Sequence, residues 1–474
     1  MIILIHQRRI TVSIQTEQDV QEIIDLQKKF FYSGITKNVD FRIKQLRKLQ
    51  TLIKEHEDEL LNALKKDLGK NPFEAYVSEI GITLKSIQTM INNVKQWAKT
   101  EKVKTPLFQM PSKSFIMKEP YGSVLIIGPF NYPFQLVIEP LIGALAAGNC
   151  AVIKPSESTP EVTSVIQRMI SANFDPAYLK VVEGEKKETS LLINAPFDYL
   201  FFTGSVPVGK IVMEAASKNL VPHTLELGGK SPTIVDETAD LKKAAQRILW
   251  GKLINAGQTC IAPDYLVVHQ SVKEELIEQL KSTIHDFYGD TISENDQYGK
   301  IVNEKHFDRL VSILEKDREH IVAGGETNRE ERFIAPAILD SITWSNEAMQ
   351  DEIFGPILPV LTYNQLDEAI EMIQSRPKPL ALYVFTEDKQ TEKKVLESLS
   401  FGGGCVNDTL SHVANDQLPF GGVGHSGVNA YHGKHSFDLF SHRKSMMKKS
   451  TKVELKLAFP PYTTSLETIK KVLK

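Results

Sequence analysis

From Tyr121 onward, short apolar runs alternate with longer stretches of helical periodicity. Of all the features of the sequence, this alternation restricts the possible fold most strongly. The first run, VLIIG, stops at Gly128 and Pro129, as a strand buried in a parallel sheet would. Similar runs follow in CAVIKPSE, YLKVVEG, FDYLFFTGS, HTLELGG and SPTIVD. Strands separated by helical segments of about ten residues or more predict a parallel, doubly wound α/β sheet.

A second alternation begins near Ala239. A helical segment that reaches Ile254 leads to GQTC, and the strand-like segments YLVVH, HIVAGG, ILPVLTY and LALYVFT follow. This pattern predicts another α/β domain with its own core, and a length of 474 residues suits two or three domains. Residues from about 16 to 100 are predicted to form helices with stops at Ser33-Gly34 and Gly69, and their Lys- and Glu-rich faces are interpreted as solvated surface.

Charge and cysteine content exclude several classes of function. A net charge of -3 gives no basic field, so no nucleic-acid partner is predicted. The three cysteines are widely spread and odd in number, which argues against a disulfide framework and favours a reducing compartment, the cytoplasm: they are Cys150, Cys260 and Cys405. No pair has metal-ligand spacing, so no metal site is predicted.

Neither a signal peptide nor a membrane span is predicted. The start, MIILIHQRRI, has its basic residues after a short apolar run, the wrong order for a signal peptide, and is interpreted as an edge strand or an extended end. The most apolar stretch, from Val124 to Ile153, is interrupted by prolines and polar residues.

Cys260, in NAGQTCIAPDY, is the candidate nucleophile. A cysteine is usually a buried small hydrophobic residue, but here Asn255, Gln258 and Thr259 are polar neighbours, and Gly257 permits close backbone approach. A thiol of ordinary pKa (about 8.5) is only a few per cent ionised at neutral pH, so it needs a positive field or a nearby base.

Two further residues suit covalent chemistry at sulfur. Glu226, in HTLELGGKSP, ends an apolar run, where a carboxylate is costly to bury, and it could activate the water that hydrolyses a thioester. The alternative is a hydrogen bond to the Gly228-Gly229 turn. Asn131, in IIGPFNYPFQ, lies just past a strand end and could donate to an oxyanion together with the backbone N–H of Cys260, or could simply form a turn between two prolines.

The chain contains a GxGxxG pattern at Gly422, Gly424 and Gly427, but no strand precedes it and no βαβ unit follows, so it is rejected as a dinucleotide site. FFTGSVPVGKIVMEAA is the better candidate. There a strand reaches Thr203, and a helix opens whose N-terminus could hold a pyrophosphate; the candidate contacts are Gly204, Ser205 and Gly209.

Two other segments complete the candidate cofactor site. Lys154 and Glu157, in CAVIKPSE, stand at a strand end where they could bind the adenosine ribose. Glu352, in QDEIFGPILP, could hold a second ribose, with Phe354 packed near a nicotinamide. Taken singly, the segment with Gly204 could equally be a helix start, and Lys154 and Glu157 could be solvated charges. The segment with Glu352 could be a turn beside a strand.

Taken together, these segments resemble the aldehyde dehydrogenase superfamily from about residue 20 to 462. The matching pieces, PFNYPF, IKPSE, FTGS, LELGGKSP, GQTC, EIFGP and PFGG, are collinear, and seven such matches make coincidence improbable. GQTCIAPDY, FGGGCVNDT, YHG, HSFDLFSH and PPY are similar to the class 3 branch of fatty and aromatic aldehyde enzymes.

The resemblance implies Cys260 as nucleophile, Glu226 as general base and Asn131 in the oxyanion hole of an enzyme that oxidises an aldehyde, of apolar aliphatic or aromatic type, to its acid. It implies NAD as cofactor, with NADP possible. The implied cofactor contacts are Lys154, Gly204, Ser205, Glu352 and Phe354, to which the local patterns above add Glu157 and Gly209. Asn407, in the CVND segment, is expected near the active site.

The implied fold is α/β, with a Rossmann-variant cofactor domain that lacks GxGxxG, an α/β catalytic domain and a small β arm that joins a homodimer. We assign residues 1–106 and 118–226 to the cofactor domain with its N-terminal helices and 227–418 to the catalytic domain. The arm is assigned to 107–117 and 430–455, and 456–474 form a C-terminal tail.

Some residues depart from the family pattern. Phe130 stands where many relatives have Trp, and Asn429 replaces an expected glycine in a turn that should survive because Asn tolerates positive φ. Glu185 stands where a small residue is common. The C-terminal tail places Leu466, Ile469, Val472 and Leu473 on one helical face with lysines elsewhere, which suits a solvated helix better than weak contact with an anionic membrane surface.

Three other functions are weighed against this one. Acyl transfer to coenzyme A or phosphate is disfavoured because such relatives usually lack the general-base carboxylate, whereas Glu226 is present. A binding or structural protein would not need nucleophile, base and oxyanion donor together. A cysteine hydrolase would need a partner His, and none stands in a suitable motif.

Overall fold

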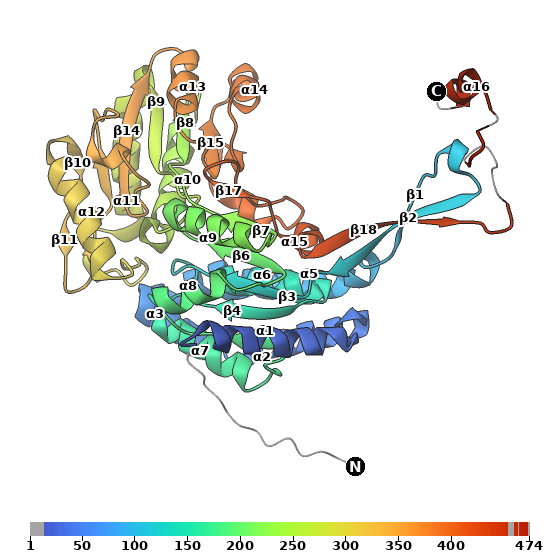
Figure 1. Cartoon of the computed structure of the whole chain (residues 1–474). Coiled ribbons are helices and arrows are strands. Elements are labelled where there is room, and N and C mark those ends of the chain that lie inside the picture. Colours follow the sequence, from blue (N-terminus) through green and yellow to red (C-terminus); the bar gives the residue numbers. More distant parts are fainter. Residues whose placement is uncertain (1–13, 454–458, 463, 473–474) are drawn as a thin grey trace.

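The structure, a computed structural model, describes residues 14–453, 459–462 and 464–472. Two sheets covered by helices form two lobes, and a narrow three-stranded arm projects away from them (Figure 1). The α/β class with parallel sheets is therefore confirmed. The edge strand expected within the first ten residues lies outside the described residues.

The chain begins with the helices that the apolar spacing predicts. α1 ends before Ser33-Gly34, and Gly69, at φ 68°, ends α3, both as expected. A π-helical turn, η2, was not predicted. The bounds are α1 Glu17–Tyr32, α2 Val39–Glu55, α3 Glu57–Leu68, α4 Pro72–Ala75, η2 Tyr76–Gly81 and α5 Ile82–Trp97.

The first sheet has the strand order β17-β7-β6-β3-β4-β5 and is parallel except for β17, which runs antiparallel to β7. α1, α8 and α9 cover one face, while α6, α7 and the other N-terminal helices cover the opposite face. The bounds are β3 Ser123–Ile127, α6 Gln135–Ala147, β4 Cys150–Lys154, α7 Pro160–Ser171, β5 Leu179–Val181, α8 Lys186–Ile193, β6 Tyr199–Thr203, α9 Val206–Lys218, β7 His223–Glu226 and β17 Gly427–Val428.

The second sheet has the order β10-β13-β14-β9-β8-β15-β16, with only β10 antiparallel to its neighbour. The expected strands YLVVH and ILPVLTY coincide with β9 and β14, whereas β13 and β16 were not predicted. The bounds are β8 Pro232–Val235, α10 Leu241–Leu253, β9 Tyr265–His269, α11 Lys273–Tyr288, α12 Glu304–Lys316, β10 Ile321–Ala323, β13 Ala337–Leu339, β14 Ile357–Tyr363, α13 Leu366–Gln374, β15 Ala381–Phe385, α14 Lys389–Ser398 and β16 Gly403–Val406. A hairpin of β11 Thr327–Asn328 and β12 Phe333–Ile334 stands apart from this sheet.

The arm is an antiparallel sheet of β1 Glu101–Val103, β2 Ser112–Pro120 and β18 Ser441–Lys449. Within the predicted arm segment 430–455, α15 Gly433–Leu439 packs instead against α5 and α6, because Phe437 is buried there against Trp97. Residues just before β18 thus lie with the first lobe rather than in the arm. The division into domains otherwise stays a prediction.

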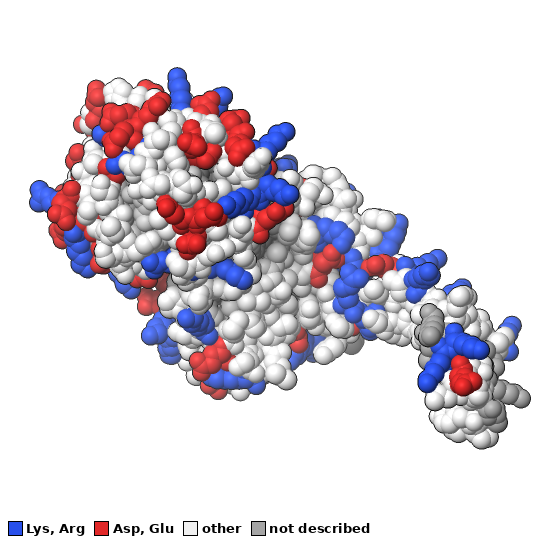
Figure 2. Space-filling model, turned by 90° about the horizontal axis from the view of Figure 1, so that it is seen from above, with Lys and Arg blue, Asp and Glu red and all other residues white. Residues whose placement is uncertain are grey.

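The C-terminal tail contains α16 Leu466–Val472, near the end of the arm in Figure 1. Leu466 is exposed, as a solvated helix would leave it, and Leu473 lies outside the described residues. Figure 2 shows acidic and basic side chains interspersed over the lobes. No helix in the described part of the chain combines the length and apolar character needed to cross a bilayer.

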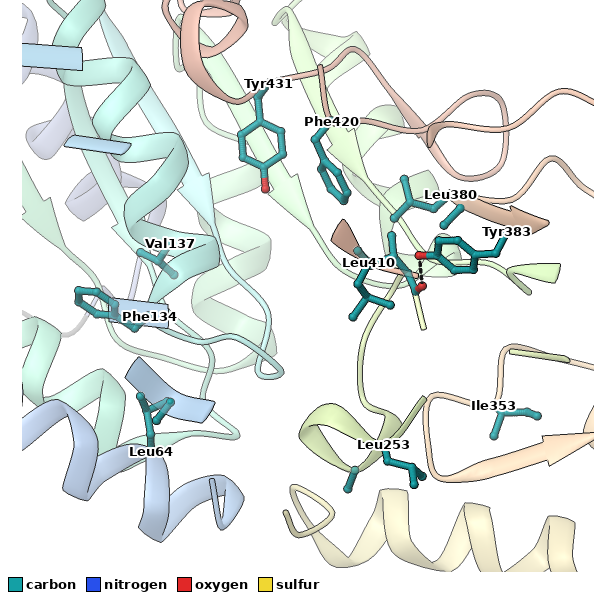
Figure 3. Close-up of a cluster of buried hydrophobic side chains, with 14 of the residues drawn as sticks. Leu64, Phe134, Val137, Leu253, Ile353, Leu380, Tyr383, Leu410, Phe420 and Tyr431 are labelled. Atoms are coloured by element: carbon teal, nitrogen blue, oxygen red, sulfur yellow. Dashed lines mark hydrogen bonds between the residues drawn. The ribbon is translucent and has the colours of Figure 1, made fainter. Parts of the chain in front are cut away.

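One hydrophobic cluster extends through both lobes. It includes Leu64 and Phe134 from the first lobe and Leu253, Leu380 and Tyr383 from the second, and Figure 3 shows these side chains where the lobes meet. Because the cluster is continuous and buried, it holds the two sheets in one relative position. Residues carried by different sheets can therefore form a single rigid site.

Candidate active site

The carboxyl ends of four parallel strands meet at one edge of the first sheet. Ile127 pairs with Lys154 and with Phe202, and Thr203 pairs with Glu226, so β3, β4, β6 and β7 end at the same level. Open α/β sheets bind ligands at this edge. Four predicted site residues therefore lie at or just past it: Asn131, Lys154, Gly204 and Glu226.

Cys260 reaches the same region from the second lobe. It follows α10 and a turn, η4 Ile254–Gly257, in which Asn255, Ala256 and Gly257 have φ values of 54°, 50° and 77°. A side chain on Gly257 would collide with the carbonyl oxygen of Gly355, so only glycine allows this approach. The turn leaves Cys260 half-buried.

The hydroxyl of Tyr383, on β15, donates to the carbonyl oxygen of Ile261 at 2.7 Å, as Figure 3 shows. This bond fixes the residue that follows Cys260 to the second sheet. The nucleophile candidate is thus held from both sides, by the left-handed turn before it and by this bond after it.

The thiol of Cys260 is electrostatically disfavoured from ionising on its own. Burial raises its pKa, and the carboxyl groups of Glu352 and Glu226 raise it further. The backbone N–H groups of Cys260 and Ile261 act in the opposite direction, which means that they face the sulfur. Because the oxyanion of an attacked carbonyl forms on a carbon bonded to this sulfur, N–H groups in this place are candidate donors to it.

Glu226 is buried, with 2% of its surface exposed, and burial raises its pKa well above the ordinary value. Both of its carboxyl oxygens lack a hydrogen-bond partner within the part of the chain that the structure describes. The alternative, a carboxylate that hydrogen-bonds the Gly228-Gly229 turn, is therefore not observed. Such a group is costly to bury unless it serves chemistry.

Asn131 is fixed through its backbone and free at its side chain. Its carbonyl oxygen accepts from the Lys70 ammonium at 2.9 Å and from the Asn255 side chain at 2.8 Å. Its side-chain amide makes no hydrogen bond to any described residue and remains available as a donor. The neighbouring Phe130 contacts Phe354 with the edge of one ring toward the face of the other and 5.7 Å between centroids, so it packs against a second aromatic ring.

The start of α9 fits a pyrophosphate. Ser205 precedes the helix, but its side chain does not cap it, so the first N–H groups have no side-chain partner. A Cβ on Gly204 would lie 2.5 Å from the Phe202 ring, and one on Gly209 would lie 2.6 Å from Leu227. Glycine at both positions lets the helix N-terminus sit close to the sheet edge.

The ribose candidates also lie at this edge. The ammonium of Lys154 is buried and bonds the Glu157 carboxylate at 2.7 Å, so Lys154 is not a solvated charge. Glu352 lies against Gly228, where any side chain would collide with its carboxylate, and burial raises the pKa of Glu352 to about 8. Phe354 has a positive φ of 50°. These donors and acceptors fit the two riboses of a dinucleotide.

Local geometry bears on several predictions about individual residues. The Asn407 side-chain oxygen accepts from the Thr386 N–H at 2.9 Å and its amide donates to the Thr386 carbonyl at 2.8 Å, which holds this side chain against the second sheet. That Asn407 lies near the active site stays a prediction. The rejected GxGxxG pattern opens no helix, since Gly427 lies in β17 beside Glu226. Asn429 has φ 71°, as expected.

The interpretation of the N-terminal charges as solvated is wrong for Lys70 and Glu79. Both have 0% exposed side chains and pair at 2.5 Å. In the sequence, Lys70 lies between the Gly69 helix stop and Asn71-Pro72. This position outside the helical runs was the only sign that Lys70 differs from the lysines on the helical faces. For Glu79 the sequence held no signal, because its burial depends on the unpredicted η2 turn.

Comparison with known proteins identifies one family. The aldehyde dehydrogenase family model matches residues 6–446. A Staphylococcus aureus protein named 4,4'-diaponeurosporen-aldehyde dehydrogenase is 57% identical over 94% of this chain and 97% of its own length. A Rattus norvegicus protein named aldehyde dehydrogenase, dimeric NADP-preferring, is 42% identical over 93% of this chain and 98% of its own.

Solved structures agree with these relatives. A substrate-bound Staphylococcus aureus AldH superposes with a TM-score of 0.95 at 56% identity, over 96% of this chain and 99% of that one. An indole-3-acetaldehyde dehydrogenase complexed with NAD+ has a TM-score of 0.84 at 26% identity, over 92% and 89% of the two chains.

The raised pKa of Cys260 predicts slow alkylation of the isolated chain. At pH 8 iodoacetamide should modify this thiol about tenfold or more slowly than a free cysteine, because only the thiolate reacts. The rate should still rise with pH where a free thiol has levelled off. Mass spectrometry of each cysteine-containing peptide measures it, with Cys260→Ala to confirm the assignment. A rate that levels off near the ordinary thiol pKa contradicts this prediction.

Proposed function

The chain belongs to the aldehyde dehydrogenase family and oxidises an aldehyde to a carboxylic acid with NAD or NADP, and on that premise we propose that Cys260 is its nucleophile. The observation that carries the proposal is Glu226: a buried carboxyl without a hydrogen-bond partner among the described residues, whose charge acts on the Cys260 thiol. A nucleophile and a base whose ionisations oppose each other can exchange a proton.

The first half of the reaction is addition to the carbonyl. The Cys260 thiol loses its proton, to the Glu226 carboxylate in the wild type and to solvent water where that carboxylate is absent, and the sulfur then bonds to the aldehyde carbon. The negative oxygen accepts hydrogen bonds from the Asn131 side-chain amide and the Cys260 N–H. When bound, the oxidised nicotinamide supplies a positive charge and accepts the hydride that leaves this carbon. Cys260 then carries the acyl group as a thioester.

The second half is hydrolysis. Glu226 first releases the thiol proton to solvent and then removes a proton from water, and the water oxygen bonds to the thioester carbon while Asn131 again stabilises the oxyanion. Collapse of this intermediate breaks the carbon–sulfur bond and releases the acid. Transfer to coenzyme A or phosphate would not need this base, and the free carboxyl of Glu226 supports water as the acceptor. Product analysis with and without coenzyme A separates the two.

We propose that the cofactor spans the edge of the first sheet. Gly204, Ser205 and Gly209 let the start of α9 bind the pyrophosphate. Lys154 and Glu157 would then bind the adenosine ribose. The Glu157 carboxylate repels a 2′-phosphate, which favours NAD over NADP. Glu352 binds the other ribose, and Phe354 packs near the nicotinamide.

Two substitutions separate nucleophile from base. Cys260→Ala should abolish aldehyde oxidation. Glu226→Gln should still release about one equivalent of reduced cofactor per site in a burst, but its steady-state rate should fall by a factor on the order of 10²–10⁴, because the amide cannot deprotonate water. Stopped-flow absorbance of the reduced cofactor measures both phases.

The pH profile gives a second readout of the same pair. Because the pKa of Glu226 is raised, its base form is lost already well above the pH at which an ordinary carboxylate protonates, so wild-type turnover should fall as pH decreases through that raised pKa. A Glu226→Gln variant that keeps the full steady-state rate would exclude Glu226 as the base.

We further propose that the substrate is an apolar aldehyde. The Glu74 carboxylate accepts from the Asn255 N–H at 2.9 Å, so α4 and η2 lie beside the turn that leads to Cys260. On these same turns Phe73, Tyr76 and Val77 are exposed to solvent. Exposed apolar side chains next to a reactive site offer contact to an apolar chain.

This proposal predicts a dependence on chain length. Wild-type kcat/KM should rise from propanal to decanal, and Phe73→Ser with Val77→Ser should lower it severalfold for decanal while leaving propanal unchanged, because each buried CH₂ is worth about 0.8 kcal/mol. Tyr32→Ser, an equally exposed position on α1, is the control. Equal loss for both aldehydes contradicts an apolar contact at this face.

We propose a homodimer joined through the arm. β18 is a nine-residue edge strand that pairs with β2 alone among the described strands, and it exposes Met446 and Met447. A long edge of this kind is normally covered. A second copy of β18 would cover it by antiparallel pairing, and the name of the rat relative supports a dimer.

Light scattering tests the dimer. The wild type should have about twice the chain mass. Met446→Lys with Met447→Lys should shift it to the monomer mass, because like charges would face each other across the pair. Leu220→Lys, at an even more exposed apolar position on the first lobe, should leave the mass unchanged. A double variant that stays dimeric rules out the arm.

We also place the enzyme in the cytoplasm. Cys150, Cys260 and Cys405 are free thiols in the structure, and Cys260 must remain reduced to act as a nucleophile. A reducing compartment supports that requirement.

A further inference from the structure

A buried ion pair lies behind the proposed oxyanion hole. The Lys70 ammonium bonds Glu79 at 2.5 Å and the Asn131 carbonyl oxygen at 2.9 Å, and it stands 4.0 Å from the centre of the Tyr132 ring. Neither side chain of the pair has any exposed surface. Apart from Glu79, the ammonium therefore contacts the residue that carries the oxyanion donor and that residue's neighbour.

Glu79 holds the other end of the same segment. Its second carboxyl oxygen accepts from the N–H of Phe134 at 2.9 Å and of Gln135 at 3.2 Å, where α6 begins. A carboxylate at a helix N-terminus is stabilised by the helix dipole and the free N–H groups. Lys70 and Glu79 together thus clamp the backbone from Asn131 to Gln135.

The clamped segment also touches the approach to Cys260. The Asn255 side chain donates to the Asn131 carbonyl at 2.8 Å, and the Tyr132 hydroxyl bonds the Thr259 hydroxyl at 2.7 Å. The two proposed oxyanion donors, the Asn131 amide and the Cys260 N–H, are therefore fixed relative to each other across the junction between the lobes.

Stability alone does not account for this pair. Removing two charges from water is costly, and apolar residues of similar volume can often replace a buried ion pair with no loss of stability, or even with a gain. Fixed geometry is a better account, because oxyanion donors displaced by about 1 Å lose much of their effect on rate.

We propose that Lys70 and Glu79 are positioning residues of the oxyanion hole, which act on the reaction through Asn131. This inference rests on the proposed function of Asn131. The pair touches neither substrate nor cofactor; it fixes the donor that stabilises the transition state. Its loss should lower the rate of the step that forms the thioester more than it changes the KM for aldehyde.

A double-mutant cycle tests this coupling. Lys70→Met keeps most of the side-chain volume but removes the donor, and it should slow the pre-steady-state burst of reduced cofactor about tenfold in the otherwise wild-type enzyme. In the Asn131→Ala background the same change should have no further effect, because its route of action is gone. Lys70→Arg, which retains a donor, should recover most of the rate.

Two measurements distinguish a positioning role of the pair from a general loss of native structure. Lys273→Met, which breaks the largely buried pair of Lys273 with Asp340 at the far side of the second lobe, should leave the burst rate unchanged. Iodoacetamide should alkylate Cys260 at the wild-type rate in Lys70→Met, since alkylation forms no oxyanion. If Lys70→Met does not fold, the cycle is run with Glu79→Gln, which removes the charge and keeps the shape.

Opposite results overturn the inference. Equal slowing by Lys70→Met with and without Asn131 would make the pair a scaffold only, and an unchanged burst rate in folded Lys70→Met would deny it any role in the reaction. If Asn131→Ala itself leaves the burst rate unchanged, the proposed role of Asn131 fails first. If Asn131→Ala loses the rate and Lys70→Met does not, only the positioning role of the pair fails.

Discussion

The hydrogen bond from the Asn255 side chain to the Asn131 carbonyl oxygen joins the two lobes where the chemistry is proposed to occur. The proposed nucleophile comes from a turn of the second lobe, while the proposed base and oxyanion donor come from the strand ends of the first. Neither sheet alone holds a complete site. The continuous hydrophobic cluster holds the two lobes together, and this bond fixes Asn255 relative to Asn131. The Lys70 ammonium holds the same oxygen from within the first lobe.

Three acidic groups of the site lie in surroundings that do little to stabilise their charged forms. Burial raises the pKa of Cys260, of Glu226 and of Glu352, and the charges of the two glutamates also oppose ionisation of the thiol. The isolated chain therefore keeps these groups largely protonated. A positive ligand at the sheet edge reverses this balance, because it stabilises whichever neighbour ionises. The thiol is thus protected from adventitious reagents until the reactants are assembled.

The sequence predicted correctly those elements and residues that a short local pattern is enough to identify. β3, β9 and β14 are mostly apolar runs, which by themselves indicate burial, and Cys260 stood out because its neighbours are polar. It failed where burial depends on partners distant in the chain. β13 and β16 have three and four residues, too few for a periodic pattern, and they exist only because longer strands pair with them.

The pair of Lys70 and Glu79 shows the same limit most clearly. Charged residues in a helical region are solvated unless tertiary structure supplies partners, and here those partners lie about 60 residues away at Asn131 and Phe134. The site concentrates what ordinary cores avoid: a carboxyl without a partner among the described residues at Glu226, left-handed backbone before Cys260, and a buried ion pair behind Asn131. Each feature costs folding free energy, and each falls where a fixed donor, base or nucleophile is needed. That coincidence is what an active site imposes on a fold that must also remain stable.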